Sequence, residues 1–189
     1  MNAQLSLFAP EYPKRGVVMT PGGTYRYRLW EVWKAGPQVA FVMLNPSLAT
    51  HQKDDPTFRR CRDFAERWGF SGMQIVNLFA FVTPFPKVMR KADDPVGADN
   101  GQHVVEVLRH PEVERVVCAW GAGGTMNGAG VAMRKLIVSE GHVPHCLGLT
   151  RYGQPLHPGR LAKSLVPVPW LEPGADGRGQ AVDSLGAEG

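Results

Sequence analysis

Residues 38–46 have the sequence Gln38-Val39-Ala40-Phe41-Val42-Met43-Leu44-Asn45-Pro46, an apolar run that stops abruptly at an Asn-Pro pair. Such a run is typical of a strand that is buried on both faces of a parallel sheet. Similar runs start at Gly72, Arg115 and Pro144, and residues 25–33 begin with alternating large apolar and charged residues, as a half-exposed edge strand does. These segments are the predicted strands.

Helical segments separate these strands. Asp54-Asp55-Pro56 predicts the start of a helix that Gly69 ends, because Asp side chains accept hydrogen bonds from free backbone N–H groups and proline is tolerated at the first helical position. Residues 99–110 and 131–140 are predicted to form two further helices. The alternation predicts an α/β fold: a three-layer α/β/α arrangement with a mainly parallel central sheet of about four strands plus an N-terminal edge strand.

The composition is that of one globular domain, with 43% hydrophobic and 20% charged residues in 189. We expect a single domain over residues 23–171, after an irregular segment 1–22 and before a disordered tail 172–189. No apolar run approaches the ~20 residues that a membrane-spanning helix needs, and the N-terminus has no charged leader. We therefore expect a cytoplasmic protein without a membrane partner.

The net charge and the cysteine content limit the kinds of partner and metal site that we expect. The formal net charge of +4 is compatible with a polyanionic partner such as DNA, and equally with a basic soluble protein that has none. Three widely spaced cysteines suggest neither a disulfide framework nor a zinc site, so we expect small buried hydrophobic side chains at Cys61, Cys118 and Cys146. We expect no cofactor and no obligatory metal.

Candidate site residues follow the predicted strands. In open α/β sheets the ligand cleft lies beyond the carboxyl ends of the strands, and those ends carry Asn45, Asn77 and Trp120, with His157 in the last loop. These strand ends supply amides, an aromatic ring and an imidazole, but no catalytic nucleophile and no set of metal ligands. Such residues are suited to binding a planar polar ring.

The order of these motifs resembles the uracil-DNA glycosylase superfamily. The matching segments are Leu44-Asn45-Pro46, Ile75-Val76-Asn77, Val117-Cys118-Ala119-Trp120-Gly121-Ala122 and His157-Pro158. The resemblance implies a glycosylase-like fold in which Asn45 positions water, Asn77 reads a base edge and His157 stabilises the departing base. A longer series of motifs over residues 25–170 also resembles a bacterial family known only as a domain of unknown function, which implies no activity.

The closing motif departs from the glycosylase pattern. The superfamily has Ser and Pro after His-Pro and a wedge Leu, whereas this chain has His157-Pro158-Gly159-Arg160-Leu161. An asparagine at position 45 can orient water but cannot act as a general base, since an amide takes up no proton near pH 7.

Each candidate residue also has a structural interpretation. Asn45 can serve a strand-to-loop turn, Asn77 can cap a loop, and His157 can be a surface residue. Phe79 and Trp120 could stack on a base, although aromatic residues at strand ends more often belong to the core. Candidate phosphate ligands are the glycine-rich loop, which could instead be mobile, and two loop arginines: Gly121, Gly123, Gly124, Arg151 and Arg160.

Three functions therefore remain open from sequence. The first is a protein that recognises a nucleobase in DNA or a nucleotide and hydrolyses its N-glycosidic bond. The second is a non-catalytic module that binds a nucleotide or nucleic acid. The third is a protein-interaction domain or a metabolic domain for some unrelated small molecule.

Overall fold

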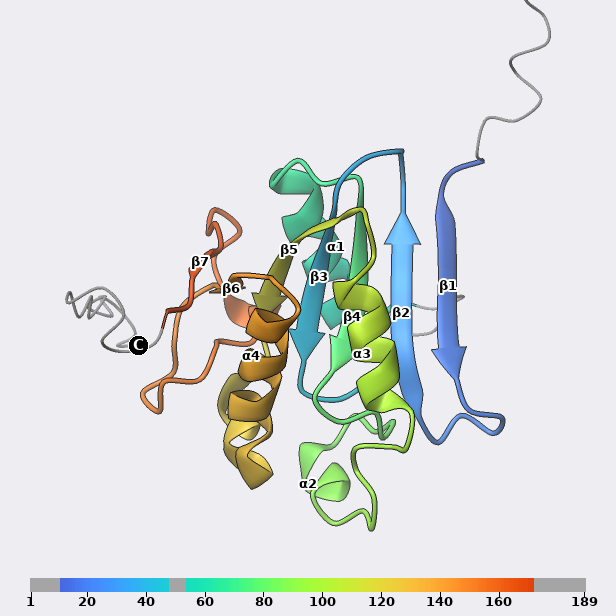
Figure 1. Cartoon of the computed structure of the whole chain (residues 1–189), viewed down its shortest axis with the longest axis vertical. Coiled ribbons are helices and arrows are strands. Elements are labelled where there is room, and N and C mark those ends of the chain that lie inside the picture. Colours follow the sequence, from blue (N-terminus) through green and yellow to red (C-terminus); the bar gives the residue numbers. More distant parts are fainter. Residues whose placement is uncertain (1–10, 48–53, 172–189) are drawn as a thin grey trace, which may run out of the picture.

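The computed structural model describes residues 11–47 and 54–171. These residues form a mixed seven-stranded sheet in the order β1-β2-β4-β3-β5-β6-β7 (Figure 1). The strands are β1 Lys14–Met19, β2 Arg26–Val32, β3 Gln38–Met43, β4 Gly72–Asn77, β5 Val113–Cys118, β6 Pro144–Cys146 and β7 Val168–Pro169. The predicted α/β class is confirmed.

The centre of the sheet is parallel and its margins are antiparallel. β3 pairs in parallel with β4 and with β5, and β5 pairs in parallel with β6. The pairings of β2 with β1 and β4, and of β6 with β7, are antiparallel. All six residues of β3 are buried, as its apolar sequence predicts. The prediction of a mainly parallel sheet is correct only for this central part.

The N-terminal prediction needs a correction. β2 is not an edge strand, because β1 pairs along its outer side within the segment 1–22 that we expected to be irregular. β1 contains Gly16, where a Cβ atom would lie 2.1 Å from the ring of Trp30, so the glycine lets the two strands approach. The remaining residues of that segment before position 11, and the predicted tail 172–189, lie outside the described residues.

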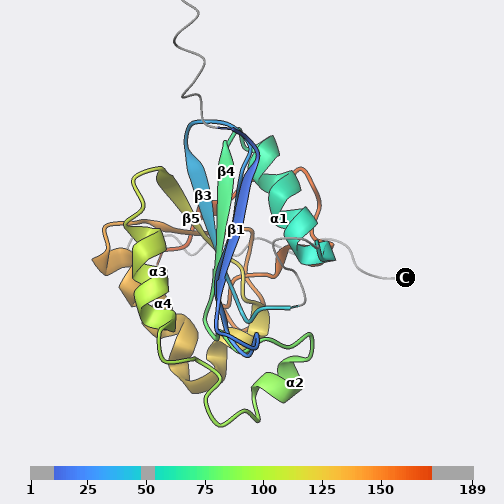
Figure 2. The same ribbon diagram turned by 90° about the vertical axis from the view of Figure 1, so that its right-hand side faces the viewer.

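The helices are α1 Pro56–Arg67, the short α2 Pro86–Met89, α3 Asn100–Leu108 and α4 Ala129–Ser139, with 3-10 helices η2 Gly121–Gly128 and η3 Pro158–Arg160. Figure 2 shows α1 on one face of the sheet and α3 and α4 on the other. Each face has its own apolar cluster: Phe41, Phe58 and Phe64 belong to the first, and Phe79 and Trp120 to the second.

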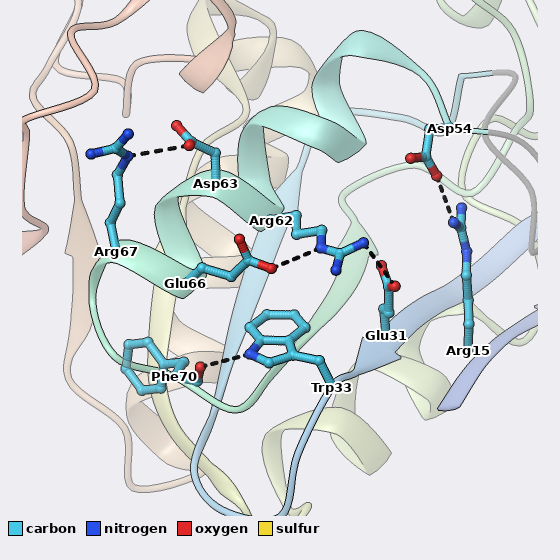
Figure 3. A network of polar contacts seen from close by, with 9 residues as sticks. All are labelled: Arg15, Glu31, Trp33, Asp54, Arg62, Asp63, Glu66, Arg67 and Phe70. Atoms are coloured by element: carbon cyan, nitrogen blue, oxygen red, sulfur yellow. Dashed lines mark hydrogen bonds and ion pairs between the residues drawn. The ribbon is translucent and has the colours of Figure 1, made fainter. Parts of the chain in front are cut away.

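Polar contacts fix α1 to the N-terminal strands (Figure 3). Arg62 contacts the buried carboxylate of Glu31 on β2 at 3.1 Å, and Arg15 of β1 contacts Asp54 at 2.5 Å. Because Asp54 directly precedes the helix N-cap, these contacts set the position of the N-terminus of α1 against β1 and β2. That end of the helix borders the candidate site.

Candidate functional site

A pocket of about 210 Å³ lies at the carboxyl ends of the parallel strands. The sheet changes winding direction at β3, since the next strand along the chain, β4, lies on one side of it and β5 on the other. Open α/β sheets bind their ligands at such a point. The lining includes the candidate residues Asn45, Asn77, Trp120 and His157, so the structure brings together four side chains that are far apart in sequence.

Asn77 ends β4 and is 1% exposed. Its side chain lies on the same face as Ile75, because side chains alternate along a strand, and both residues line the pocket. Within the described part of the chain, neither Nδ2 nor Oδ1 of Asn77 has a hydrogen-bond partner. A buried polar group without a partner costs about 1–3 kcal/mol. This amide therefore offers the N–H groups of Nδ2 as donors and Oδ1 as an acceptor to a molecule in the pocket.

Asn45 follows β3 and is held by its amino group. Nδ2 donates to the carbonyl of Thr83 at 2.8 Å and to that of Pro46 at 3.1 Å. These bonds tie the end of β3 to the loop after β4, as the structural interpretation of Asn45 expects. Since both bonds use Nδ2, the amide oxygen Oδ1 stays an acceptor.

His157 is exposed at the pocket and precedes η3. Its Nδ1 lies 3.2 Å from the backbone N–H of Gly159, which assigns the acceptor role to Nδ1 and the proton of the neutral ring to Nε2. Desolvation by the surrounding atoms lowers the pKa of His157, while the charge of Asp55 acts to raise it. The imidazole is therefore neutral at pH 7, with Nε2–H as a donor.

Two charged residues of the pocket were not among the predicted site residues. Asp55 caps α1, and its Oδ1 accepts from the backbone N–H of Phe58 at 2.7 Å, which confirms the predicted helix start. The same side chain lines the pocket. Arg26 of β2 also lines it and is 4% exposed. Burial lowers the pKa of Arg26 to about 10, partly opposed by Asp55, so the guanidinium stays charged at neutral pH.

Sequence reasoning missed these two for different reasons. The predicted capping of the helix already explained an aspartate at position 55, so nothing in the sequence indicated that Asp55 also lines the pocket. Arg26 belongs to a strand predicted to be half-exposed, and the outer strand β1 that helps bury this part of the sheet was not predicted. Two local features of the sequence could have indicated a role in the site. Asp55 is a helix-cap residue next to the predicted cleft, and Arg26 lies at the start of a predicted strand.

The aromatic candidates belong to the core. Trp120 is 1% exposed, donates from Nε1 to Gln154 Oε1 at 2.9 Å and packs edge-on against Trp170. It contributes to the pocket wall from within that packing. Phe79 packs in the core cluster that faces α3 and α4 and is not among the lining residues. Stacking on a base is therefore not supported for Phe79.

The candidate phosphate ligands do not line the pocket within the described residues. They are Gly121, Gly123, Gly124, Arg151 and Arg160. The glycine-rich segment forms η2 rather than an open loop, and Gly123 and Gly124 are buried. A Cβ atom would lie 2.6 Å from Leu44 at position 123 and 2.1 Å from Trp120 at position 124, so these two glycines allow close packing. This explains the glycines without a phosphate.

Among the described residues there is neither a helix that could span a membrane nor a cluster of metal-binding side chains. None of their helices combines the length and apolar character needed to cross a bilayer. No group of three or more His, Cys, Asp and Glu side chains in residues 11–47 and 54–171 is arranged to hold a metal ion. The three cysteines are free and buried, as predicted.

Comparison with known proteins gives a family and no activity. No curated protein and no solved structure matches the chain. Residues 26–159 match the model of a family described as "Protein of unknown function (DUF1643)", and this stretch contains every pocket residue discussed above. The chain belongs to the DUF1643 family.

Proposed function

We propose that the pocket binds a nucleobase and that the protein hydrolyses the N-glycosidic bond of that base, as its resemblance to the uracil-DNA glycosylase superfamily suggests. The observation that carries the proposal is the buried amide of Asn77, which lines the pocket and has no partner among the described residues. A base edge presents adjacent donors and acceptors, and an asparagine amide can pair with both.

The size of the pocket supports a single heterocycle. Its volume of about 210 Å³ lies below the ~300–1,000 Å³ of pockets for drug-sized ligands. Leu29, Met43, Phe58 and Ile75 add apolar lining, which suits the faces of a flat ring. A base would occupy the pocket while its sugar stays at the mouth, in reach of the solvent-exposed His157.

The charged residues suit the chemistry of bond cleavage. Hydrolysis of an N-glycosidic bond develops positive charge on the sugar and negative charge on the base. In the proposed reaction a water attacks the anomeric carbon, the C–N bond electrons pass to the base, and Asp55 takes a proton from the water. Asn45 Oδ1 orients that water. Nε2–H of His157 donates to a base oxygen, and the base anion is then protonated by solvent.

The test is base release from a panel of oligonucleotides and nucleosides with normal, deaminated and hypermodified bases, with alkali used to reveal abasic sites. Asp55→Asn keeps a capping side chain and removes the base, so we expect release to fall about 10²–10⁴-fold. Asn45→Ala and His157→Ala are expected to fold and to lose release. Glu66→Gln is the matched control, because Glu66 is an exposed carboxylate of the same helix and does not line the pocket. Equal release by wild type, Asp55→Asn and His157→Ala would exclude this mechanism.

A non-catalytic binding module is the second candidate. The observation that favours it is that Oδ1 of Asp55 already accepts the N-cap hydrogen bond from Phe58, which leaves only Oδ2 to take a proton from water. This candidate predicts that bases or nucleotides bind in an Asn77-dependent way and that no substrate of the panel yields an abasic site.

A further inference from the structure

The rim of the pocket carries an exposed aromatic side chain. Pro84 and Pro86 both line the pocket, and Phe85 between them is 64% exposed. Its backbone is fixed, since the N–H of Phe85 donates to Thr83 Oγ1 at 3.2 Å and its carbonyl accepts from the N–H of Val88 at 2.9 Å. Phe85 is thus a large apolar side chain held in solvent on an ordered segment.

The short helix α2 that follows is anchored in the core and basic outside. Met89 is fully buried, whereas Lys87, Arg90 and Lys91 are exposed. These three cations line a shallow hollow of about 500 Å³ together with Phe81, Val88 and Ala92. None of the three forms an ion pair with a residue of the described ranges. Figure 1 shows α2 beyond the carboxyl ends of β3 and β4. Residues at these strand ends, Met43 and Asn77, line the pocket.

Residues 157–161, around His157, carry no exposed large apolar side chain, and the exposed Leu149 and Tyr152 earlier in the same loop do not line the pocket. Leu161 packs partly buried against the core cluster under α1. Arg60 of α1 holds this segment by donating to the carbonyls of Pro158, at 3.3 Å, and Leu161. Leu161 is therefore not available to enter a base stack, and the apolar side chain exposed at the rim comes from Phe85.

We propose that Phe85 and the basic surface of α2, formed by Lys87, Arg90 and Lys91, bind a single-stranded nucleic acid beside the base pocket. Proteins that bind single strands combine cations along the backbone with aromatic side chains on which unpaired bases stack. In this arrangement Phe85 stacks on a base adjacent to the one in the pocket, and the cations contact the flanking phosphates. The inference deepens the proposed function and rests on it, because it names the polymer that carries the base.

The experiment measures the affinity of the full chain for a fluorescent single-stranded DNA of mixed sequence, by anisotropy over a range of salt concentrations. For Phe85→Ala we expect about 5- to 150-fold weaker binding. For Lys87→Gln/Lys91→Gln we expect weaker binding and a log–log salt slope smaller by about 1.4, from two lost phosphate contacts. The control Lys34→Gln/Lys135→Gln removes two exposed lysines elsewhere and is expected to bind as wild type.

The outcomes separate this inference from the proposed function. If the variants of the α2 surface lose affinity for single-stranded DNA and Asn77→Leu does not affect nucleoside binding, the nucleic-acid surface at α2 is supported and the base pocket is contradicted. If Asn77→Leu loses nucleoside binding while the α2 variants bind DNA like the control, the base pocket is supported and the nucleic-acid surface at α2 is contradicted. Tighter binding of a duplex of the same sequence, or equal binding of a polyglutamate peptide, also overturns it.

Discussion

Two buried asparagines of the site region differ in the hydrogen bonding of their amino groups. Asn77 is 1% exposed, and neither polar atom of its side chain has a partner among the described residues. Asn100 is 2% exposed and donates from Nδ2 to the carbonyls of Asn77 and Leu78 at 3.0 and 3.2 Å, so that only its Oδ1 is left without a partner among these residues. A buried polar group without a partner lowers the stability of the folded protein. Such a group is expected at a binding site, where a ligand completes its hydrogen bonds.

This contrast predicts opposite effects of the same substitution. Asn77→Leu is expected to raise the free energy of unfolding by about 1 kcal/mol, because it removes an unpaired buried amide. Asn100→Leu is expected to lower it by about 1–3 kcal/mol, because two carbonyls lose their donor. Urea denaturation of both variants measures the difference. A clear loss of stability in Asn77→Leu would show that its amide is satisfied in the folded protein.

The protonation of His157 can be measured directly. Desolvation lowers its pKa and Asp55 opposes that shift, so we expect an NMR titration to give a pKa below the ordinary 6.5. Asp55→Asn removes the opposing charge and is expected to lower the pKa further. Ligand binding through neutral Nε2–H should then persist below pH 6.5 and weaken as the ring becomes protonated at Nδ1, which now accepts from Gly159. A pKa above 6.5, or one that Asp55→Asn leaves unchanged, would contradict this.

At the scale of single residues, the sequence predicts the polar strand ends better than the charges around them. Asn45 and Asn77 follow from one rule, that parallel strands present their carboxyl ends at one edge of the sheet, and His157 lies in the loop that follows the last of these strands. No comparable rule points to Arg26, whose burial depends on β1 and on the pairing of distant segments.

At the scale of elements, local pattern predicts those that rely on local contacts. The N-cap of α1 and the apolar run of β3 are both confirmed. β1 and the two-residue β7 were not predicted, because their hydrogen bonds come from distant strands and their own sequences have no clear alternation. The single turn of helix α2, Pro86–Met89, was not among the predicted helices, because four residues are too few to show helical periodicity.

The glycine-rich element η2 allows a test of packing against phosphate binding. Gly124→Ala places a methyl group 2.1 Å from Trp120 Nε1, so we expect a loss of about 1–3 kcal/mol in the free energy of unfolding. The matched control is Gly101→Ala in α3, where nothing lies within 4 Å and alanine favours the helix, with an expected gain of about 0.5–1 kcal/mol. Thermal unfolding of both variants provides the comparison. Equal stability of Gly124→Ala and wild type would mean that η2 is loose enough for another role.

At the scale of the whole molecule, the pocket depends on nearly the entire domain. Its lining includes residues of β2, β3, α1 and β4, and extends along the chain from Arg26 to His157. Such a site exists only when the sheet is assembled, so a ligand that binds it stabilises the folded state against the unfolded chain by mass action. The family match over residues 26–159 covers the same stretch.

This link between ligand binding and folding gives a prediction that can be tested without measuring enzymatic activity. A nucleobase or nucleoside present at one hundred times its Kd adds about 2.7 kcal/mol to stability, which raises the Tm of a domain of this size by about 5–10 °C. We expect such a rise in wild type, measured by differential scanning fluorimetry, and none in Asn77→Leu, which should itself fold at least as stably. A benzene derivative of similar size controls for apolar filling of the pocket, since it cannot pair with the amide of Asn77. An equal rise in both proteins, or a rise with the benzene derivative alone, would mean that the pocket recognises shape and not a base edge.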